Sequence, residues 1–151
     1  MSHFEAVENG VHVRFNSSEK TFLGDVLPLL AGVGQAGVDP AATRLNVPVY
    51  LDNPEANEEW WRLMGEDLTE SRRKDRSVFE RVVAAEGDVV LSSHDADAFL
   101  RVVNEARLAL AARMGLDIEE DHERLPEDQR QVLDYLGWIL EELTHELSLG
   151  L

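Results

Sequence analysis

The sequence predicts a mainly α-helical domain, a helical bundle of four to five helices with a small N-terminal β-hairpin that a third short strand extends. Three observations support this prediction. Alternating apolar residues flank an Asn-Gly pair near the N-terminus, apolar residues recur at helical spacing after residue 53, and residues 99–115 are apolar around most of a helix. The 151 residues suffice for one domain with a core and are too few for two ordinary ones, so we expect a single domain over residues 1–151.

The hairpin is predicted at residues 4–15, because Asn9-Gly10 lies between two alternating segments. Both residues tolerate the positive φ that tight hairpin turns require. The alternation places Val11, Val13 and Phe15 on one face. An isolated hairpin is marginal in water, so a strand or helix must cover it, and residues 88–91 fit a third short strand.

Two helices are predicted in the first half of the chain from their caps. Ser17-Ser18-Glu19 is typical of a helix start, and Pro28 should kink or end the helix that follows. Asn53-Pro54-Glu55 combines an N-cap, a proline at the first helical position and an acid in the first turn, so we expect a helix to about residue 85. The residues expected to supply its apolar contacts are Trp61, Leu63, Met64, Leu68, Val78, Phe79, Val82 and Val83.

Two more helices are predicted in the second half. Ser92 or Ser93 caps the first of them, with Asp95 placed for a capping box. Gly115 suits its left-handed C-cap. After an acidic connector, the last helix begins near Pro126 and repeats leucine, isoleucine and valine at helical spacing.

The composition excludes several classes of function. Thirty acidic residues against fourteen basic ones give a formal net charge of −16, which disfavours nucleic acid and an anionic membrane surface as partners. The chain has no cysteine, so disulfides, thiolate catalysis and cysteine-based zinc sites are excluded. No signal-peptide pattern opens the chain, and we expect a cytoplasmic protein.

Polar residues interrupt the otherwise apolar helix at residues 99–115. Asn104 and Arg107 share a face, and Arg113 lies on a neighbouring stripe. If this helix is buried, its arginines need partners, since an unpaired buried charge is costly. The sequence therefore predicts a polar centre inside the domain, where Arg107→Ala would cost about 3–5 kcal/mol if the arginine pairs with a buried acid.

Two interpretations of this centre stay open. It is either a structural charge network, in which Arg107 pairs with Glu58 or Asp134, or a site for an anionic ligand. The ligand site would use Asn104, Arg107, Arg113 and Arg44. No glycine-rich phosphate loop accompanies these residues, which favours the structural interpretation.

Other residues are candidates for an interface. Gly137 interrupts the last helix at a cost of about 1 kcal/mol, so a close approach by another helix or a ligand is expected there. Trp138 beside it fits a dimer contact. A basic island that includes Arg72, Arg73 and Arg76 is either a solvated helix face or a docking patch.

No metal or cofactor site is predicted. The His145-Glu146 pair lacks the second histidine of the zinc-protease pattern, because residue 149 is leucine. The acidic connector at 117–123 lacks the EF-hand spacing and its central glycine. We expect neither a metal nor a catalytic residue, and no serine pairs with a histidine in a known elbow.

Three segments together resemble a known family. They are residues 39–68, with Asp39-Pro40 and the Asn-Pro-Glu-Ala helix start, the Asn104-x-x-Arg107-Leu108 stretch to Gly115, and Leu136-Gly137-Trp138. They are similar to the actinobacterial domain-of-unknown-function family usually encoded beside the ClpS adaptor of the Clp protease. The resemblance implies no established activity, cofactor or catalytic residue. Its gene neighbourhood suggests a link to regulated proteolysis or amino-acid metabolism.

The function that fits these observations is a non-enzymatic interaction or regulatory domain that binds a protein partner, with a homodimer as the first expectation. The alternative is a small-molecule binding domain in which Arg107 and Asn104 hold an anionic group. An enzyme is a third reading, for which the sequence offers no set of catalytic residues.

Overall fold

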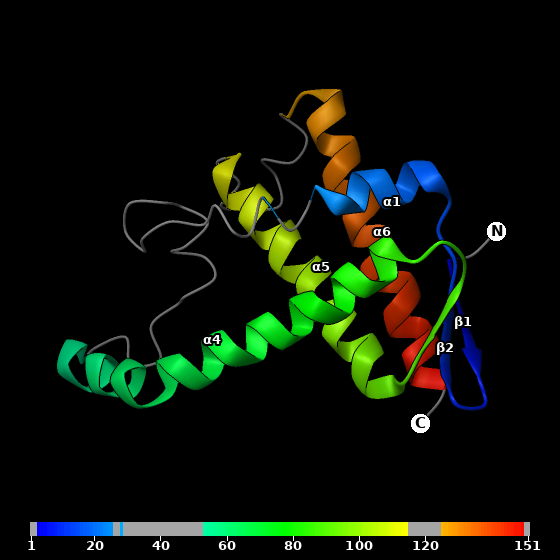
Figure 1. The fold of residues 1–151 in the computed structure, drawn as a ribbon. Helices are drawn as coiled ribbons and strands as arrows, with labels where there is room; N and C mark the ends of the chain where they lie inside the picture. The colour runs from blue at the N-terminus through cyan, green and yellow to red at the C-terminus, as the bar shows by residue number, and fades with distance from the viewer. Residues whose placement is uncertain (1–2, 26–27, 29–52, 115–124, 150–151) are drawn as a thin grey trace.

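The computed structural model describes residues 3–25, 28, 53–114 and 125–149. Within them the chain folds mainly into helices with one small sheet, as the sequence predicts (Figure 1). Several predictions lie outside the described residues, namely Arg44, the part of the resembling segment before residue 53, the cap at Gly115 and the acidic connector. No helix of the described residues is long and apolar enough to cross a membrane.

The sheet confirms the predicted hairpin and its third strand. Strands β1 (Phe4–Val7), β2 (Gly10–Val13) and β3 (Val89–Leu91) are antiparallel and lie in the order β1-β2-β3. Phe4 pairs with Val13, and Val11 pairs with Leu91. The three residues predicted to share the inner face, Val11, Val13 and Phe15, are all buried.

The turn of the hairpin differs from the prediction by one residue. Glu8 and Asn9 form the turn, and Gly10 is already the first residue of β2, paired with Val7. Gly10 has φ +149°, whereas no other described residue, Asn9 included, has a positive φ. A Cβ at Gly10 would lie 1.9 Å from the Leu91 carbonyl oxygen. The glycine is therefore required by the close approach of β3 as well as by its φ.

Capping residues set the helix starts. Helix α1 (Ser17–Gly24) begins one residue earlier than predicted, because Asn16 is the N-cap and forms a capping box with Glu19. Ser92 caps α5 (Ser93–Arg113) as predicted, accepting a hydrogen bond from the Asp95 backbone N–H. The Asp95 carboxylate does not complete a capping box but binds Arg81, 2.7 Å away.

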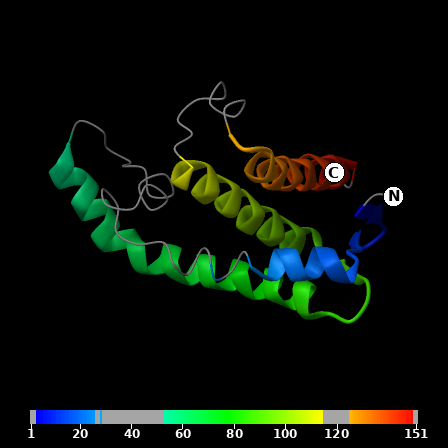
Figure 2. The same cartoon turned by 90° about the horizontal axis from the view of Figure 1, so that it is seen from above.

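Helix α4 (Pro54–Ala84) has the predicted start and end, with Asn53 accepting from the Ala56 N–H. Its predicted apolar face is wrong for the first half of the helix. Leu63 is 60% exposed and Met64 is 41% exposed, and the helix buries only Asp75, Phe79 and Val82. The first turns of α4 lie beyond the other described helices (Figures 1 and 2).

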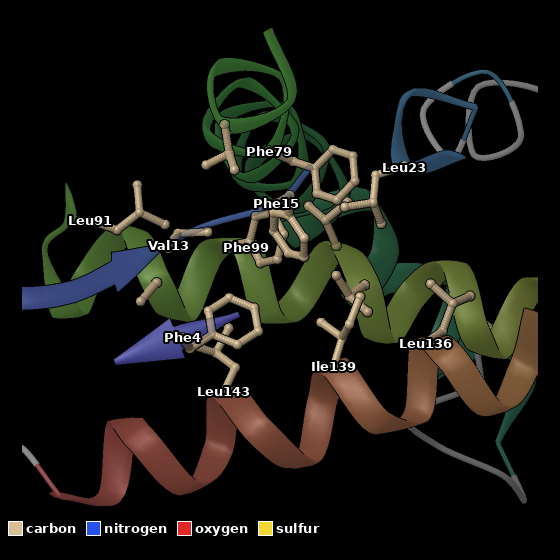
Figure 3. Packing of buried hydrophobic residues seen from close by; sticks show 14 of the residues in the cluster. Phe4, Val13, Phe15, Leu23, Phe79, Leu91, Phe99, Leu136, Ile139 and Leu143 are labelled. Atoms are coloured by element: carbon tan, nitrogen blue, oxygen red, sulfur yellow. The ribbon is translucent and has the colours of Figure 1, made fainter. Parts of the chain in front are cut away.

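The core forms where α5 lies between α4 and α6 (Glu127–Leu149) and the sheet closes one end (Figures 1 and 2). Phe99 is at the centre, stacked on Phe79 with ring centroids 5.0 Å apart and on Phe15 at 6.1 Å (Figure 3). From the other side, α6 contributes Leu136, Ile139 and Leu143. Burial of these side chains removes apolar surface from water at about 25 cal/mol per Å² and holds the layers together.

Candidate functional site

The predicted polar residues of α5 lie on its outside. Asn104, Arg107 and Arg113 are all exposed, so the prediction that they form a polar centre inside the domain is wrong. The side of α5 that packs against its neighbours is built from small and apolar residues, and alanine lets neighbouring helices approach closely. The buried residues of α5 are Ala96, Ala98, Phe99, Val102, Val103, Ala106, Ala109 and Ala112.

Arg107 lies against Gly137 of the neighbouring helix. An ideal Cβ at Gly137 would be 3.3 Å from Arg107 Nε and 3.6 Å from Cζ, so the guanidinium occupies the space that a side chain would fill. The close contact that the sequence predicts at Gly137 is thus a contact with the Arg107 side chain. No hydrogen bond or ion pair joins Arg107 to the described residues, and its side chain is exposed.

A hollow of about 310 Å³ surrounds this guanidinium. We name it, with its rim, the Arg107 face. Trp138 on the rim is 55% exposed. The face is lined by Arg107, Leu133, Asp134, Gly137, Trp138, Leu140 and Glu141.

The residues proposed around Arg107 are only partly brought together. Asp134 lines the Arg107 face, whereas Glu58 is exposed on the projecting part of α4 and does not line it. The condition for a 3–5 kcal/mol loss in Arg107→Ala, pairing with a buried acid, is therefore not met. Arg113 lies in the last turn of α5, two turns beyond Arg107, and Arg44 is outside the described residues.

A buried charge network does exist, but between α4 and α5. Asp75 is 6% exposed and accepts two hydrogen bonds from Arg101, both 2.8 Å long. One turn along, Glu105 lies 3.7 Å from Arg72 and 3.6 Å from Arg76. Burial raises the pKa of Glu105, and the charges of the two arginines offset this only in part. The sequence signal was the matched spacing of Arg101 and Glu105 on one helix and Arg72, Asp75 and Arg76 on the other.

This network divides the basic island that is a candidate interface. Arg72 and Arg76 are partly buried and face Glu105, while Arg73 is exposed and binds Glu70 at 2.6 Å on its own helix. The proposed interface role of these three arginines stays a prediction, and the geometry accounts for them as partners of carboxylates in the same chain.

A second polar cluster joins the N-terminus to α1 and α6. His3, which is 8% exposed, hydrogen-bonds Glu19 through Nε2 and lies 3.0 Å from Glu142 through Nδ1. The Tyr135 hydroxyl donates to Glu19 at 2.9 Å. Burial of the hydroxyl, together with the Glu19 carboxylate beside it, raises the pKa of Tyr135. Sequence reasoning missed this cluster, because 139 residues separate His3 from Glu142.

The family of the chain can now be stated. The pattern of the family described as a domain of unknown function, DUF2017, matches residues 1–147. The chain belongs to the DUF2017 family. This confirms the predicted membership of a domain-of-unknown-function family. No curated protein and no solved structure matches the chain.

The three polar regions of this DUF2017 chain differ in what they can do chemically. The α4–α5 network pairs its charges internally, and the His3 cluster buries them, whereas the Arg107 face presents an exposed arginine and an exposed tryptophan beside the Glu141 carboxylate. Among the described residues, no group of three or more histidine, aspartate or glutamate side chains could hold a metal ion. The Arg107 face is therefore the candidate functional site.

Proposed function

We propose that this DUF2017 chain is a non-enzymatic interaction domain that binds a protein partner through the Arg107 face. The observation that supports the proposal is the exposed guanidinium of Arg107, held over Gly137 and beside Trp138, without a hydrogen bond or ion pair to the described residues. Arginine and tryptophan are enriched among the residues that contribute most to protein–protein binding. A glycine that makes room for an arginine also lowers helix stability, which selection tolerates at binding sites.

The charges of the face favour a protein over a small anion. Asp134 and Glu141 line the same hollow as Arg107, so an anionic ligand would meet two carboxylates and one guanidinium. A protein surface can place acidic and basic residues opposite the charges of this face and can also cover the exposed indole of Trp138. The anionic-ligand alternative retains Asn104, which is exposed one turn before Arg107 on α5.

The first partner we propose is a second copy of the chain. A two-fold symmetric contact needs a self-complementary surface, and this face carries a cation and carboxylates together. In such a dimer Arg107 would pair with Glu141 of the other copy while the Trp138 side chains meet. The family resemblance supplies a second candidate, a component of the Clp protease of an actinobacterium, and with it a cytoplasmic location.

The test measures self-association by sedimentation equilibrium for the wild type, Arg107→Glu and Arg62→Glu. Arg62 is an exposed arginine on α4 that pairs with Glu59, so its reversal makes the same charge change away from the face. We expect Arg107→Glu to weaken the dimer about tenfold or more and Arg62→Glu to leave it unchanged. Combining Arg107→Glu with Glu141→Arg should restore part of the lost affinity.

A monomeric wild type would exclude the second copy as partner. The same variants then serve as baits in a lysate, where a protein captured by the wild type and Arg62→Glu but lost with Arg107→Glu supports the interaction function. Capture of a Clp component in that pattern would name the pathway. If no protein is captured and phosphate raises the melting temperature of the wild type but not of Arg107→Glu, the anionic-ligand alternative replaces the proposal.

A further inference from the structure

In the part of the chain that the structure describes, helix α6 and not another strand closes the outer edge of β1. β1 pairs with β2 on its other edge. On the outer edge, Glu142 accepts the backbone N–H groups of His3 and Phe4, and Glu146 accepts that of Ala6 at 2.9 Å. Two strand residues span about 6.8 Å and four helical residues about 6.0 Å, so the two carboxylates match the spacing of the N–H groups. Figures 1 and 2 show β1 beside the last turns of α6.

The His3 side chain adds a bridge at the start of this edge. Its Nδ1 lies 3.0 Å from Glu142 Oε2, and its Nε2 hydrogen-bonds Glu19 Oε2 on α1. The ring is stacked on Phe15 at 5.1 Å and meets Trp138 edge-on at 5.5 Å. One imidazole therefore ties β1 to both α1 and α6, in a place where water has little access.

The hydrogen bonds around the ring decide where its protons are. Glu19 Oε2 also accepts from the Tyr135 hydroxyl, and Oε1 accepts from the Asn16 N–H. Glu19 is thus an acceptor only, so Nε2 carries a hydrogen. Glu142 Oε1 accepts from backbone N–H groups, which favours an ionised carboxylate there too. Nδ1 then needs a hydrogen of its own to donate to Glu142.

We propose that a doubly protonated His3 is a pH-sensitive clasp, which fastens β1 to α1 and α6 and loosens when the imidazolium loses a proton. The neutral ring that keeps its Nε2 hydrogen turns the lone pair of Nδ1 toward the ionised Glu142. That contact is repulsive, and low water access makes it costly. The stabilisation is present while the imidazolium is charged and is lost when the ring becomes neutral at higher pH.

The other charged groups around His3 do not replace its charge. From α1 it faces Glu19, and from α6 it faces Glu142 and Tyr135, with Glu146 one turn further along α6. Arg14 and Asp88, at the ends of β2 and β3, line the same hollow of about 560 Å³ beside the ring. Arg14 is bound to Glu5 at 2.7 Å and to His12 at 3.1 Å, on the outer face of the sheet. Among the described residues, the imidazolium is therefore the cation that offsets Glu19 and Glu142.

The variant that tests the clasp is Glu142→Gln, with Glu80→Gln as its matched control. The glutamine oxygen can still accept the backbone N–H groups, while its amide N–H can donate to a bare Nδ1 and hold the neutral ring. Glu80 is exposed on α4, outside both the Arg107 face and the surroundings of His3, so its substitution makes the same charge change without touching either. Melting temperatures are compared between about pH 6 and about pH 9, a window that spans the ordinary titration of histidine.

We expect the wild type and Glu80→Gln to lose roughly 5 °C more in melting temperature across this window than Glu142→Gln. An equal loss in all three proteins overturns the clasp. If Glu142→Gln does not fold, the wild type decides by nuclear magnetic resonance. Two protonated ring nitrogens at about pH 6, lost together with the native shifts of the Phe4 and Ala6 amides, support the proposal. The proposal is contradicted if only one ring nitrogen carries a hydrogen at that pH. It is also contradicted if the Phe4 and Ala6 amide shifts stay unchanged when the ring loses its proton.

Discussion

Helix α5 presents charged side chains to two neighbours, and the two sides treat them differently. Toward α4, Arg101 donates two hydrogen bonds of 2.8 Å to Asp75, which is only 6% exposed. Toward α6, Arg107 lies over Gly137 and makes no hydrogen bond or ion pair to the described residues. One arginine of α5, Arg101, thus pairs with a buried carboxylate of α4, whereas another, Arg107, is available to a binding partner.

The difference follows from what each arginine faces. A buried carboxylate such as Asp75 must be paired, because an uncompensated charge away from water is expensive. Gly137 has no side chain that could pair with Arg107, and the exposed arginine lines the hollow beside it. Helix α5 therefore carries an arginine that stabilises the fold on its α4 side and an arginine that is available for binding on its α6 side. Substitutions on the two sides should have different consequences.

The largest expected effect on stability comes from breaking the paired side. Asp75→Ala leaves Arg101 without its bidentate partner and opens a gap between α4 and α5. We expect a loss of about 2–3 kcal/mol in the free energy of unfolding, below the full value for a buried pair because Arg101 is half exposed. Urea unfolding followed by circular dichroism measures it.

The control is Glu80→Ala, an exposed acid one turn further along the same helix. It should change the free energy of unfolding by less than about 0.5 kcal/mol. If Asp75→Ala is as mild as this control, the Asp75–Arg101 pair does not fix how α4 meets α5. Binding through the Arg107 face should survive Asp75→Ala wherever the variant remains folded.

Much of the fold was predictable because it depends on local chemistry. Asn53-Pro54 begins α4, Ser92 caps α5, and the alternation around Gly10 gives the hairpin, all from interactions within a few residues. The exposed first half of α4 was not predictable in this way. Its apolar residues have helical spacing, but whether another element covers them depends on where α5 ends.

The candidate site shows the same limit. Arg101 and Glu105 lie about 40° apart around a helix, and Arg107 lies about 120° from Arg101 on the other side. The sequence contains these angles but does not say which neighbour occupies which direction. Arg107 was therefore expected to be buried and paired, when Arg101 is the paired arginine. Gly137 gave the better prediction of where Arg107 lies. A glycine inside a helix lowers helix stability, so a close contact at that position was expected, and Arg107 makes it.

Gly137→Ala, at the Arg107 face, should change the free energy of unfolding by less than Asp75→Ala and in the opposite direction. The new Cβ meets only the far end of the flexible Arg107 side chain, which can move away. Helix propensity then raises the free energy of unfolding by about 0.5–1 kcal/mol, while the displaced guanidinium weakens partner binding. Gly65→Ala is the control, since its Cβ makes an ordinary 3.6 Å contact with Trp61 on α4. It should give a similar gain in stability and leave binding unchanged, whereas a destabilised Gly137→Ala would mean that Arg107 is fixed in place.

The smallest effect on stability is expected at Glu105, where the α4–α5 network leaves a carboxylate oxygen without a hydrogen bond in the described part of the chain. Its Oε2 is buried and has no hydrogen-bond partner among the described residues, and the nearest arginine atoms are too far for one. Because burial raises the pKa of Glu105 in the folded state, the folded protein binds its proton more tightly, and the carboxylate lowers stability once the pH exceeds the folded value.

Glu105→Gln should therefore raise the free energy of unfolding by about 0.5 kcal/mol at neutral pH and have less effect in acid, where the glutamate is already neutral. Thermal unfolding at both pH values measures the difference. Glu70, whose pKa is lowered by its hydrogen bond with Arg73, gives the opposite sign, so Glu70→Gln should lose stability at neutral pH and not in acid. If Glu105→Gln is destabilising at neutral pH, the two long contacts to Arg72 and Arg76 outweigh burial, and the network is as well paired at Glu105 as it is at Asp75.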